Sequence, residues 1–409
     1  MKSKISLEEI KIKSAKVKKI IADEYGSAAF THYLHNNKNG VSKYFKKEAV
    51  QFVKRELEYK FPDETISSKA AEEALQYLIF DFKHQVPFPE PQDHKFKFID
   101  LFAGIGGFRI AMQNLGGKCV FTSEWDEQAK KTYEANFGDI PFGDITKEET
   151  KKFIPDGFDV LCAGFPCQAF SIAGNRKGFA DTRGTLFFDI EQIAEKHKPK
   201  VIFLENVKNL VSHDNGNTFK TIIQILEEKL KYKVFYKVLN TATHANIPQN
   251  RERIFIVAFN PFKVKNYKEF NFPEPIKLTK TIHDCLEKGK QNDEYYYKNN
   301  HPYFNQLSSA ITSSDTIYQW RRVYARENKS KLCPTLTANM GTGGHNVPLI
   351  NDGYGIRKLT PSECFAFQGY PIKKYILPPI AKSKLYMQAG NSVTTTLVER
   401  IAKNIIDVL

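Results

Sequence analysis

Short apolar runs alternate with amphipathic helical stretches through the middle of the chain. The stretches between the runs place apolar residues three and four positions apart, which is the spacing of one face of an α-helix. Strands that alternate with helices predict βαβ units, and therefore an α/β fold with a doubly wound, mostly parallel sheet. The six runs expected to form strands are residues 96–101, 118–122, 160–163, 201–204, 234–238 and 254–259.

The alternation of predicted strands and helices is lost before residue 95 and again after residue 262. Residues before about 95 are rich in Lys, Glu, Ala and Leu, with helical periodicity over 42–59 and 67–82, and a proline-rich stretch follows that cannot continue a helix. Between about 262 and 356 the composition shifts to Tyr, Asn, Lys, Thr and Gly, which indicates an irregular domain; residues 392–409 again predict an amphipathic helix. We expect a helical extension (1–95), a main α/β domain (96–262), a smaller irregular domain (263–372) and a C-terminal segment that returns to the main domain (373–409).

Composition and charge narrow the class of protein. Hydrophobic residues make up 41% and charged residues 26% of the 409, which is typical of soluble globular proteins. No apolar run approaches the roughly 20 residues that span a bilayer. The first 20 residues lack the apolar core of a secretory signal, so we expect a cytoplasmic protein with no membrane partner. The net charge of +14 favours a polyanionic partner such as nucleic acid, because Lys and Arg release counterions from phosphate. The six cysteines form no C-x-x-C pair, so we expect reduced thiols and no metal site.

A glycine-rich turn, Asp-Leu-Phe-Ala-Gly-Ile-Gly-Gly at residues 100–107, directly follows the first predicted strand. Glycines there let the backbone turn tightly and approach a ligand at a helix N-terminus. The turn departs from the dinucleotide fingerprint, because Arg109 stands three positions after Gly106. Packing against a pyrophosphate is therefore not specified.

Acidic and aromatic residues at later strand ends complete a candidate nucleoside site. Glu124 ends the second strand, where a carboxylate can accept hydrogen bonds from ribose hydroxyls. Trp125 could stack on an adenine, and Asp144 is expected at a third strand end, where it could accept from an adenine amino group. The alternative is a turn glycine with two solvated acids.

A cysteine, a glutamate and two arginines follow at later strand ends. Cys167 lies in Gly-Phe-Pro-Cys-Gln after the run 160–163. A lone cysteine is usually a small buried hydrophobe, but this one follows a proline and precedes a polar, glycine-containing stretch typical of a loop. Glu205 ends the next run, where an acid could also cap a helix. Arg251 and Arg253 occupy alternate positions of an extended segment, which suits carboxylate or anion binding or a solvated turn.

These segments together resemble the cytosine-C5 DNA methyltransferases of bacterial restriction-modification systems. The resemblance covers about 96–409, leaves residues 1–95 outside, and implies a Rossmann-like S-adenosylmethionine-dependent fold whose irregular domain recognises the target. It implies that the enzyme flips a cytosine out of a short duplex DNA sequence and methylates its C5, and so protects the DNA from a cognate restriction endonuclease. It rests on residues 100–107, 164–168, 205–207, 249–253 and 388–393.

The resemblance also implies residue roles. Cys167 would add to cytosine C6, with Glu205, Arg251 and Arg253 as the other catalytic residues. The implied S-adenosylmethionine contacts are Phe102, Ala103, Gly104, Gly106, Gly107, Glu124, Trp125, Asp144, Ile145, Phe165, Asn391, Ser392 and Val393. The expected DNA contacts, in the lid 168–183 and in the recognition domain, are Gln168, Ser171, Arg183, Arg321, Arg322, Arg326 and Thr335.

Other interpretations stay open at this point. One branch of the same family methylates transfer RNA with the same catalytic set, although the long recognition region favours DNA. A catalytically idle DNA-binding regulator is disfavoured by the intact catalytic residues, and a nicotinamide-dependent oxidoreductase by the missing third glycine. Residues 1–95 hold 17 Lys and Arg against 14 Asp and Glu, so either regulatory DNA binding or a packing role is open for them. We expect a monomer.

Overall fold

The computed structural model describes residues 24–37, 40–81, 86–91, 93–166, 186–321, 323–342 and 346–409. Its internal contacts divide the chain into two compact units, Met1–Phe82 and Lys83–Leu409. No helix among the described residues is long and apolar enough to cross a membrane.

The first unit is helical. It contains α2 (Glu24–His35), α3 (Lys46–Lys60) and α4 (Ser68–Asp81). The α3 helix buries Ala49, Val53 and Leu57, which recur every fourth residue on one face. Helices over 42–59 and 67–82 are therefore confirmed, except that a short 3-10 turn precedes α3.

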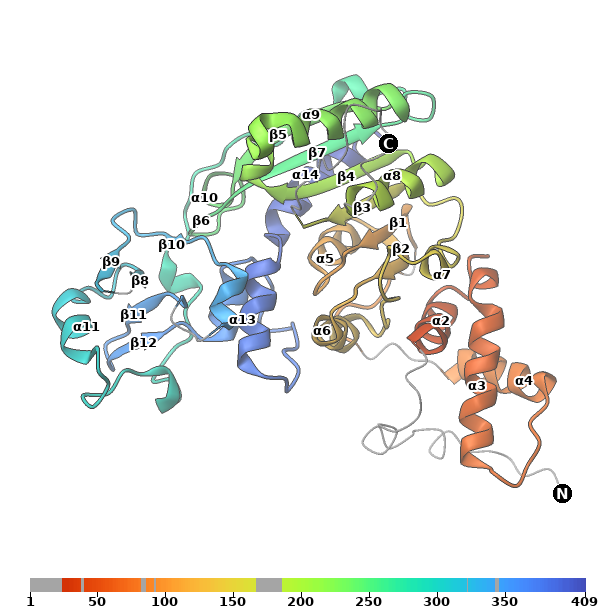
Figure 1. The fold of residues 1–409 in the computed structure, drawn as a ribbon, viewed down its shortest axis with the longest axis horizontal. Helices are drawn as coiled ribbons and strands as arrows, with labels where there is room; N and C mark the ends of the chain where they lie inside the picture. The colour runs from red at the N-terminus through yellow and green to blue at the C-terminus, as the bar shows by residue number, and fades with distance from the viewer. Residues whose placement is uncertain are drawn as a thin grey trace. The chain divides into compact units, whose positions relative to one another are not determined.

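The second unit is built around a six-stranded sheet with the order β2-β1-β3-β4-β7-β5 (Figure 1). The first four strands pair in parallel, and β7 runs antiparallel to both β4 and β5. The short link from β5 to β7, which contains α10 (Thr241–His244) and β6 (Gln249–Asn250), favours this antiparallel pairing. All six predicted strands and the mostly parallel α/β sheet are confirmed: β1 (Phe96–Leu101), β2 (Gly117–Ser123), β3 (Val160–Gly164), β4 (Val201–Val207), β5 (Lys233–Asn240) and β7 (Glu252–Phe259).

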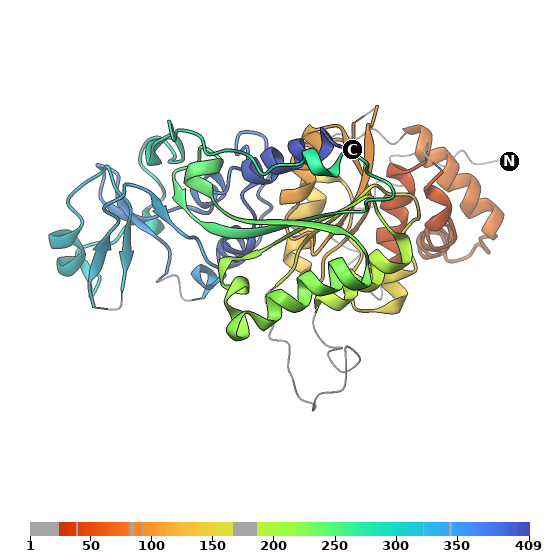
Figure 2. The same ribbon diagram turned by 90° about the horizontal axis from the view of Figure 1, so that it is seen from above.

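Helices cover both faces of this sheet. On one face, α5 (Gly107–Asn114) and α14 (Thr395–Ile406) pack against Phe98, Val160 and Phe203 in one apolar core. On the opposite face lie α8 (Leu186–His197) and α9 (Asn217–Gln224), the yellow-green and green helices of Figure 2. Two further helices, α6 (Glu127–Phe137) and α7 (Glu148–Lys151), lie between β2 and β3 in the sequence. The predicted C-terminal helix is three residues shorter at its start, because residues 392–394 are extended.

The region after residue 300 forms a second, smaller sheet. Its four short antiparallel strands have the order β12-β11-β8-β9 and share a core with α11 (Phe304–Ala310). A buried ion pair, Arg357 Nη2 to Glu363 Oε1 at 2.7 Å, links this sheet to the helix that follows it. The bounds are β8 (Tyr318–Trp320), β9 (Ala325–Glu327), β10 (Cys333–Pro334), β11 (Leu349–Asn351), β12 (Ile356–Lys358), α12 (Pro361–Ala366) and α13 (Lys382–Asn391).

Candidate active site

The glycine-rich turn leaves β1 with three residues in the left-handed backbone region: Phe102 (φ 54°), Gly104 (φ 55°) and Gly106 (φ 83°). For Phe102 this conformation costs roughly 1–2 kcal/mol, and such strain concentrates at functional sites. The Ala103 amide donates to the Ser123 carbonyl (2.9 Å), which ties the turn to the end of β2. The turn is therefore held in a defined shape by contacts within the protein.

Close packing brings the C-terminal segment to this turn. A Cβ added at Gly107 would lie 2.5 Å from Val393 Cγ2, so only glycine fits there. Ser392 is buried and shares a 2.6 Å hydrogen bond between its Oγ and the Tyr370 hydroxyl, whereas Asn391 is exposed at the end of α13. Predicted cofactor residues almost 300 positions apart thus lie together.

Glu124 is held by the backbone around it. Its two carboxylate oxygens accept from the Gly104 amide (2.7 Å) and the Asp126 amide (2.8 Å), and each oxygen keeps a further acceptor site. Burial raises the pKa of Glu124, and these two hydrogen bonds oppose the shift. Trp125 next to it is 75% exposed, which leaves an aromatic face open for stacking.

Asp144 departs from the prediction. The chain before it makes only an isolated bridge between Ser123 and Phe142, not a third strand. The predicted strand is wrong because this segment belongs to a turn, in which Asp144 Oδ1 accepts from the amide (3.0 Å) and hydroxyl (2.9 Å) of Thr146. The segment still lies beside Glu124, whose amide donates to the Phe142 carbonyl, and Ile145 is buried.

Asp100 is a buried acid that the sequence analysis did not single out. It is fully buried, and neither carboxylate oxygen has a hydrogen-bond partner of ordinary geometry among the described residues. Burial raises the pKa of Asp100 well above its usual range, against the effect of Arg109. An acid at the last position but one of a buried strand was the available signal, because acids are rarely buried without a function or a partner.

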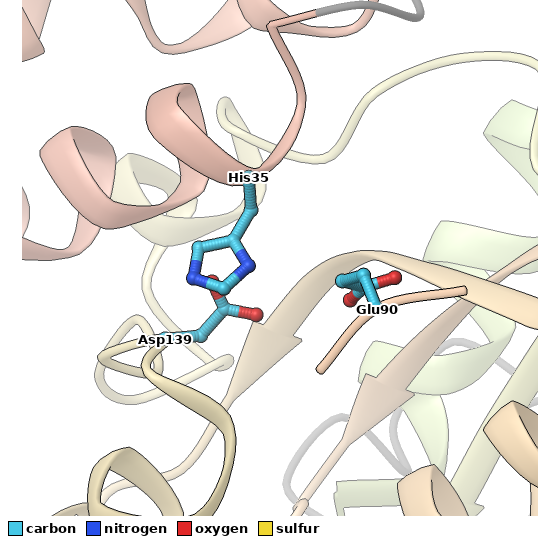
Figure 3. A group of neighbouring side chains, drawn as sticks. All are labelled: His35, Glu90 and Asp139. Atoms are coloured by element: carbon cyan, nitrogen blue, oxygen red, sulfur yellow. The ribbon is translucent and has the colours of Figure 1, made fainter. Parts of the chain in front are cut away.

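Arg109 explains the departure from the dinucleotide fingerprint. Its guanidinium is fully buried and forms ion pairs with Glu90 and Asp139, the two acids drawn in Figure 3. It also donates to the Tyr133 hydroxyl (3.1 Å). The side chain therefore fastens α5, and with it the glycine turn, to segments before and after it.

The register of the central strands places Glu205 beside the chain that leads to Cys167. Gly164 of β3 pairs with Glu205 of β4, and Cys167 follows three residues later but lies outside the described residues. Glu205 is 8% exposed, and its Oε1 is 3.1 Å from Arg253 Nε. Burial raises the pKa of Glu205, although Arg253 and Arg251 act to lower it.

Asn206 is a second residue that sequence reasoning missed. Its Nδ2 donates to the Phe165 carbonyl (2.8 Å) and its Oδ1 accepts from the Val207 amide (2.8 Å). The side chain thus holds the end of β3 against the end of β4, two residues before Cys167. Its place next to Glu205, inside the segment 205–207 that carries the family resemblance, was the available sequence signal.

The two predicted arginines occupy different places. Arg253 contacts Glu205, as described. The hydrogen bonds of Arg251 run instead to three backbone carbonyls, those of Leu336 (2.8 Å), Gly390 (3.2 Å) and Ser392 (2.5 Å). Alternate positions of an extended segment would put the two guanidiniums on the same side. Residue 251 instead lies between β6 and β7, outside either strand, and its hydrogen bonds go to backbone carbonyls while Arg253 contacts Glu205.

The predicted DNA contacts are only partly described. Gln168, Ser171, Arg183 and Arg322 lie outside the described residues. Arg321 and Arg326 are exposed on the β8–β9 hairpin. The Thr335 hydroxyl donates to the Asn250 carbonyl (2.6 Å), so its proton already has an acceptor within the protein. The cysteines among the described residues are buried free thiols, as expected.

Comparison with known proteins identifies the family. The family model of C-5 cytosine-specific DNA methylases matches residues 96–407. The chain is 52% identical over 309 residues to the type II methyltransferase M.Bsp6I of Bacillus sp. (strain RFL6), covering 75% of this chain and 96% of that enzyme. It is 46% identical over 350 residues to M.HpaII of Haemophilus parainfluenzae, covering 83% and 96%.

Solved structures agree on the fold. The Dnmt2 methyltransferase of S. pombe superposes with a TM-score of 0.57 over 76% of this chain and 98% of that one, at 19% identity. The chain belongs to the C-5 cytosine-specific DNA methylase family and is a DNA cytosine-5-methyltransferase.

Proposed function

We propose that the enzyme transfers a methyl group from S-adenosylmethionine to C5 of a cytosine flipped out of a short duplex sequence, through a covalent adduct of Cys167 with C6. The observation that carries this proposal is the buried Glu205, paired in register with Gly164 and bonded to Arg253, beside the chain that leads to Cys167. A thiol and an acid whose pKa is raised by burial, at adjacent strand ends, suit addition to a pyrimidine ring.

The residues around the glycine turn fit S-adenosylmethionine. Glu124 keeps free acceptor sites for ribose hydroxyls, and Trp125 leaves a ring face open for the adenine. Asp100 at the end of β1 is a buried carboxyl beside this turn, and neither of its oxygens has a hydrogen-bond partner of ordinary geometry among the described residues, which leaves both for a ligand bound at the turn. When bound, S-adenosylmethionine supplies an electrophilic methyl group for C5.

The protein's own groups account for the remaining chemistry. The Cys167 thiolate adds to C6, and the electron pair of the C5–C6 bond moves into the ring, where a proton shared between Glu205 and N3 neutralises it. C5 becomes nucleophilic and accepts the methyl group. A base then removes the C5 proton, the C5–C6 double bond reforms, and the thiolate leaves. Arg253 orients Glu205 through the 3.1 Å contact.

The duplex must open for this reaction, because C5 and C6 lie inside the base stack. Extruding the base costs a few kcal/mol, and we assign its capture to the lid 168–183. Arg321 and Arg326 on the exposed hairpin supply charge for phosphate or base-edge contacts. The type II names of M.Bsp6I and M.HpaII support a role in restriction-modification, in which a cognate endonuclease would cut the unmethylated sequence. We place this role in the cytoplasm.

The test incubates the pure protein and labelled S-adenosylmethionine with duplex DNA and, separately, with transfer RNA, and then maps the methylated base. We expect label at cytosine C5 of one duplex sequence. Label only in RNA, or at a cytosine amino group, would overturn the proposal. A retained rate in Cys167→Ala, with S-adenosylhomocysteine binding as in wild type, would remove Cys167 from the mechanism.

A further inference from the structure

Arg251 joins three segments that the sequence separates widely. Its side chain is 1% exposed. Nη1 donates to the carbonyl of Leu336 in the recognition region, while Nη2 donates to those of Gly390 and Ser392 in the C-terminal segment. One guanidinium thus connects the segment after Thr335, a predicted DNA contact, to Ser392, a predicted cofactor contact.

The backbones of α13 and of the segment 337–341 are in close contact at this point, which we call the joint. A Cβ added at Gly390 would lie 2.1 Å from the Thr337 carbonyl carbon, and one added at Gly341 would lie 2.4 Å from the Ser383 carbonyl oxygen. Helix α13 therefore lies directly on the 3-10 turn Ala338–Gly341. A displacement of α13 has to be transmitted to the recognition segment, because close-packed interiors do not absorb it.

Gln249, two residues before Arg251, also holds the recognition segment in place. Gln249 Nε2 donates to the Phe367 carbonyl (2.6 Å), and its Oε1 accepts from the Leu336 amide (3.1 Å). The β10 strand pairs with β6 immediately before Arg251. The recognition segment is thereby tied to the catalytic sheet at Arg251 rather than through a flexible linker.

We propose that Arg251 is a positioning residue that couples occupancy of the cofactor site to DNA recognition, by holding residues 390–392 and 336 as one unit. The proposal rests on the proposed function, which assigns Ser392 to the cofactor and Thr335 to DNA. Ligand that orders residues 390–392 orders the recognition segment too, so each ligand tightens the binding of the other by the same factor.

The measurement is the dissociation constant of a duplex containing the mapped target sequence, with and without saturating S-adenosylhomocysteine. In wild type we expect the ligand to tighten DNA binding by at least about fivefold. The ratio of interest is the dissociation constant without S-adenosylhomocysteine divided by the constant with it. In Arg251→Lys this ratio should fall close to one, because a lysine ammonium group lacks the planar, forked donors with which the guanidinium reaches all three carbonyls. A merely structural arginine would lower the melting temperature and leave the ratio unchanged.

Two further variants keep the test decisive. Gly390→Ala adds a methyl group against the Thr337 backbone and so separates α13 from the recognition segment. This variant should also bring the ratio close to one, and it can be measured even if Arg251→Lys does not fold. Arg400→Lys is the matched control, since Arg400 of α14 donates to the carbonyls of His244 and Glu274 and its replacement should keep the wild-type ratio.

The wild-type protein gives an independent readout. S-adenosylhomocysteine alone should slow amide hydrogen exchange over residues 333–342. Unchanged exchange there, a wild-type ratio of one, or a wild-type ratio in folded Arg251→Lys would each overturn the coupling. Absence of methylation of any DNA by wild type would instead overturn the proposed function, so the two failures are distinguishable.

Discussion

Glu205 is an acid whose burial favours the form that the proposed reaction needs. Transfer from water disfavours the carboxylate, and this raises the pKa of Glu205 even beside Arg253. A larger share of Glu205 is therefore protonated near neutral pH than for an exposed glutamate. Arg253 limits this rise in the pKa of Glu205, and its contact with Oε1 fixes the orientation of the carboxyl group.

This environment predicts the pH dependence of methyl transfer. The proposed reaction uses protonated Glu205, so kcat should fall as the pH rises through the raised pKa of Glu205. Arg253→Met removes a positive charge that lowers this pKa, and the falling limb of the kcat profile should move to higher pH, on top of a lower maximum. Single-turnover rates across a pH series measure this.

Glu205→Gln is the control for that profile. It keeps the shape of the side chain but cannot transfer a proton, so we expect a loss of about 10²–10⁴-fold in kcat and no limb assignable to residue 205. A falling limb that stays at the same pH in both variants would assign the titration to another group.

Asn206 should position the nucleophile segment. Asn206→Asp replaces the donor to the Phe165 carbonyl by an acceptor and so releases the chain two residues before Cys167. A displacement of about 1 Å can cost about 10²-fold in rate, and we expect a loss of this order in kcat.

The matched comparison is Asn136→Asp. Asn136 is also buried, and its Nδ2 donates to the Thr132 and Ile376 carbonyls far from Glu205. Both variants should lose stability, but only Asn206→Asp should lose rate in a single-turnover assay. Equal rates in the two variants would reduce Asn206 to a packing role.

At the scale of elements, the glycine turn combines a left-handed backbone with close packing. A Cβ on Gly106 would lie 2.2 Å from Phe137 Cε2 at a φ of 83°. Gly106→Ala should therefore combine backbone strain of roughly 1–2 kcal/mol with about 1–3 kcal/mol of overpacking, and should weaken S-adenosylhomocysteine binding.

Gly157→Ala separates the two costs. Gly157 has a φ of 79° and nothing within 4 Å of an added Cβ, so only the backbone strain should remain. Denaturant unfolding of both variants and calorimetric titration of the ligand measure the difference. Equal destabilisation would show that Phe137 moves aside at no cost.

The elements that sequence predicted well are those with the strongest apolar pattern. Five of the six strands of the main sheet are mostly buried along their length, so each reads as an apolar run, whereas the edge strand β5 is mostly exposed or half-buried. The weaker predictions were the strand before Asp144 and the start of α14. Both depend on tertiary pairing and turn geometry, which leave little apolar periodicity in the sequence.

At the scale of the whole molecule, the two units differ in what they contribute. The family match begins at residue 96, and M.Bsp6I is matched over 96% of its length by 75% of this chain. We therefore expect a protein of residues 83–409 to methylate the same cytosines as the full chain, by sequencing of methylated DNA. Altered or relaxed target sequences would give the first unit a part in recognition.

The place of truncation matters for stability. A protein that starts at residue 93 lacks Glu90 and leaves the buried Arg109 with Asp139 as its remaining carboxylate partner. Removing one partner of a buried ion pair costs about 3–5 kcal/mol. This shorter protein should unfold at lower denaturant concentration than residues 83–409.

The sequence by itself determined the sheet, the glycine turn and the identity of the catalytic candidates, because apolar runs and short motifs record local requirements. Only the tertiary structure decided which side chains meet. It placed Glu205 opposite Gly164, Ser392 beside the glycine turn, and the hydrogen bonds of Arg251 on the carbonyls of Leu336 and Ser392. Contacts between residues far apart in the sequence depend on how strands register and helices pack, which no local pattern encodes.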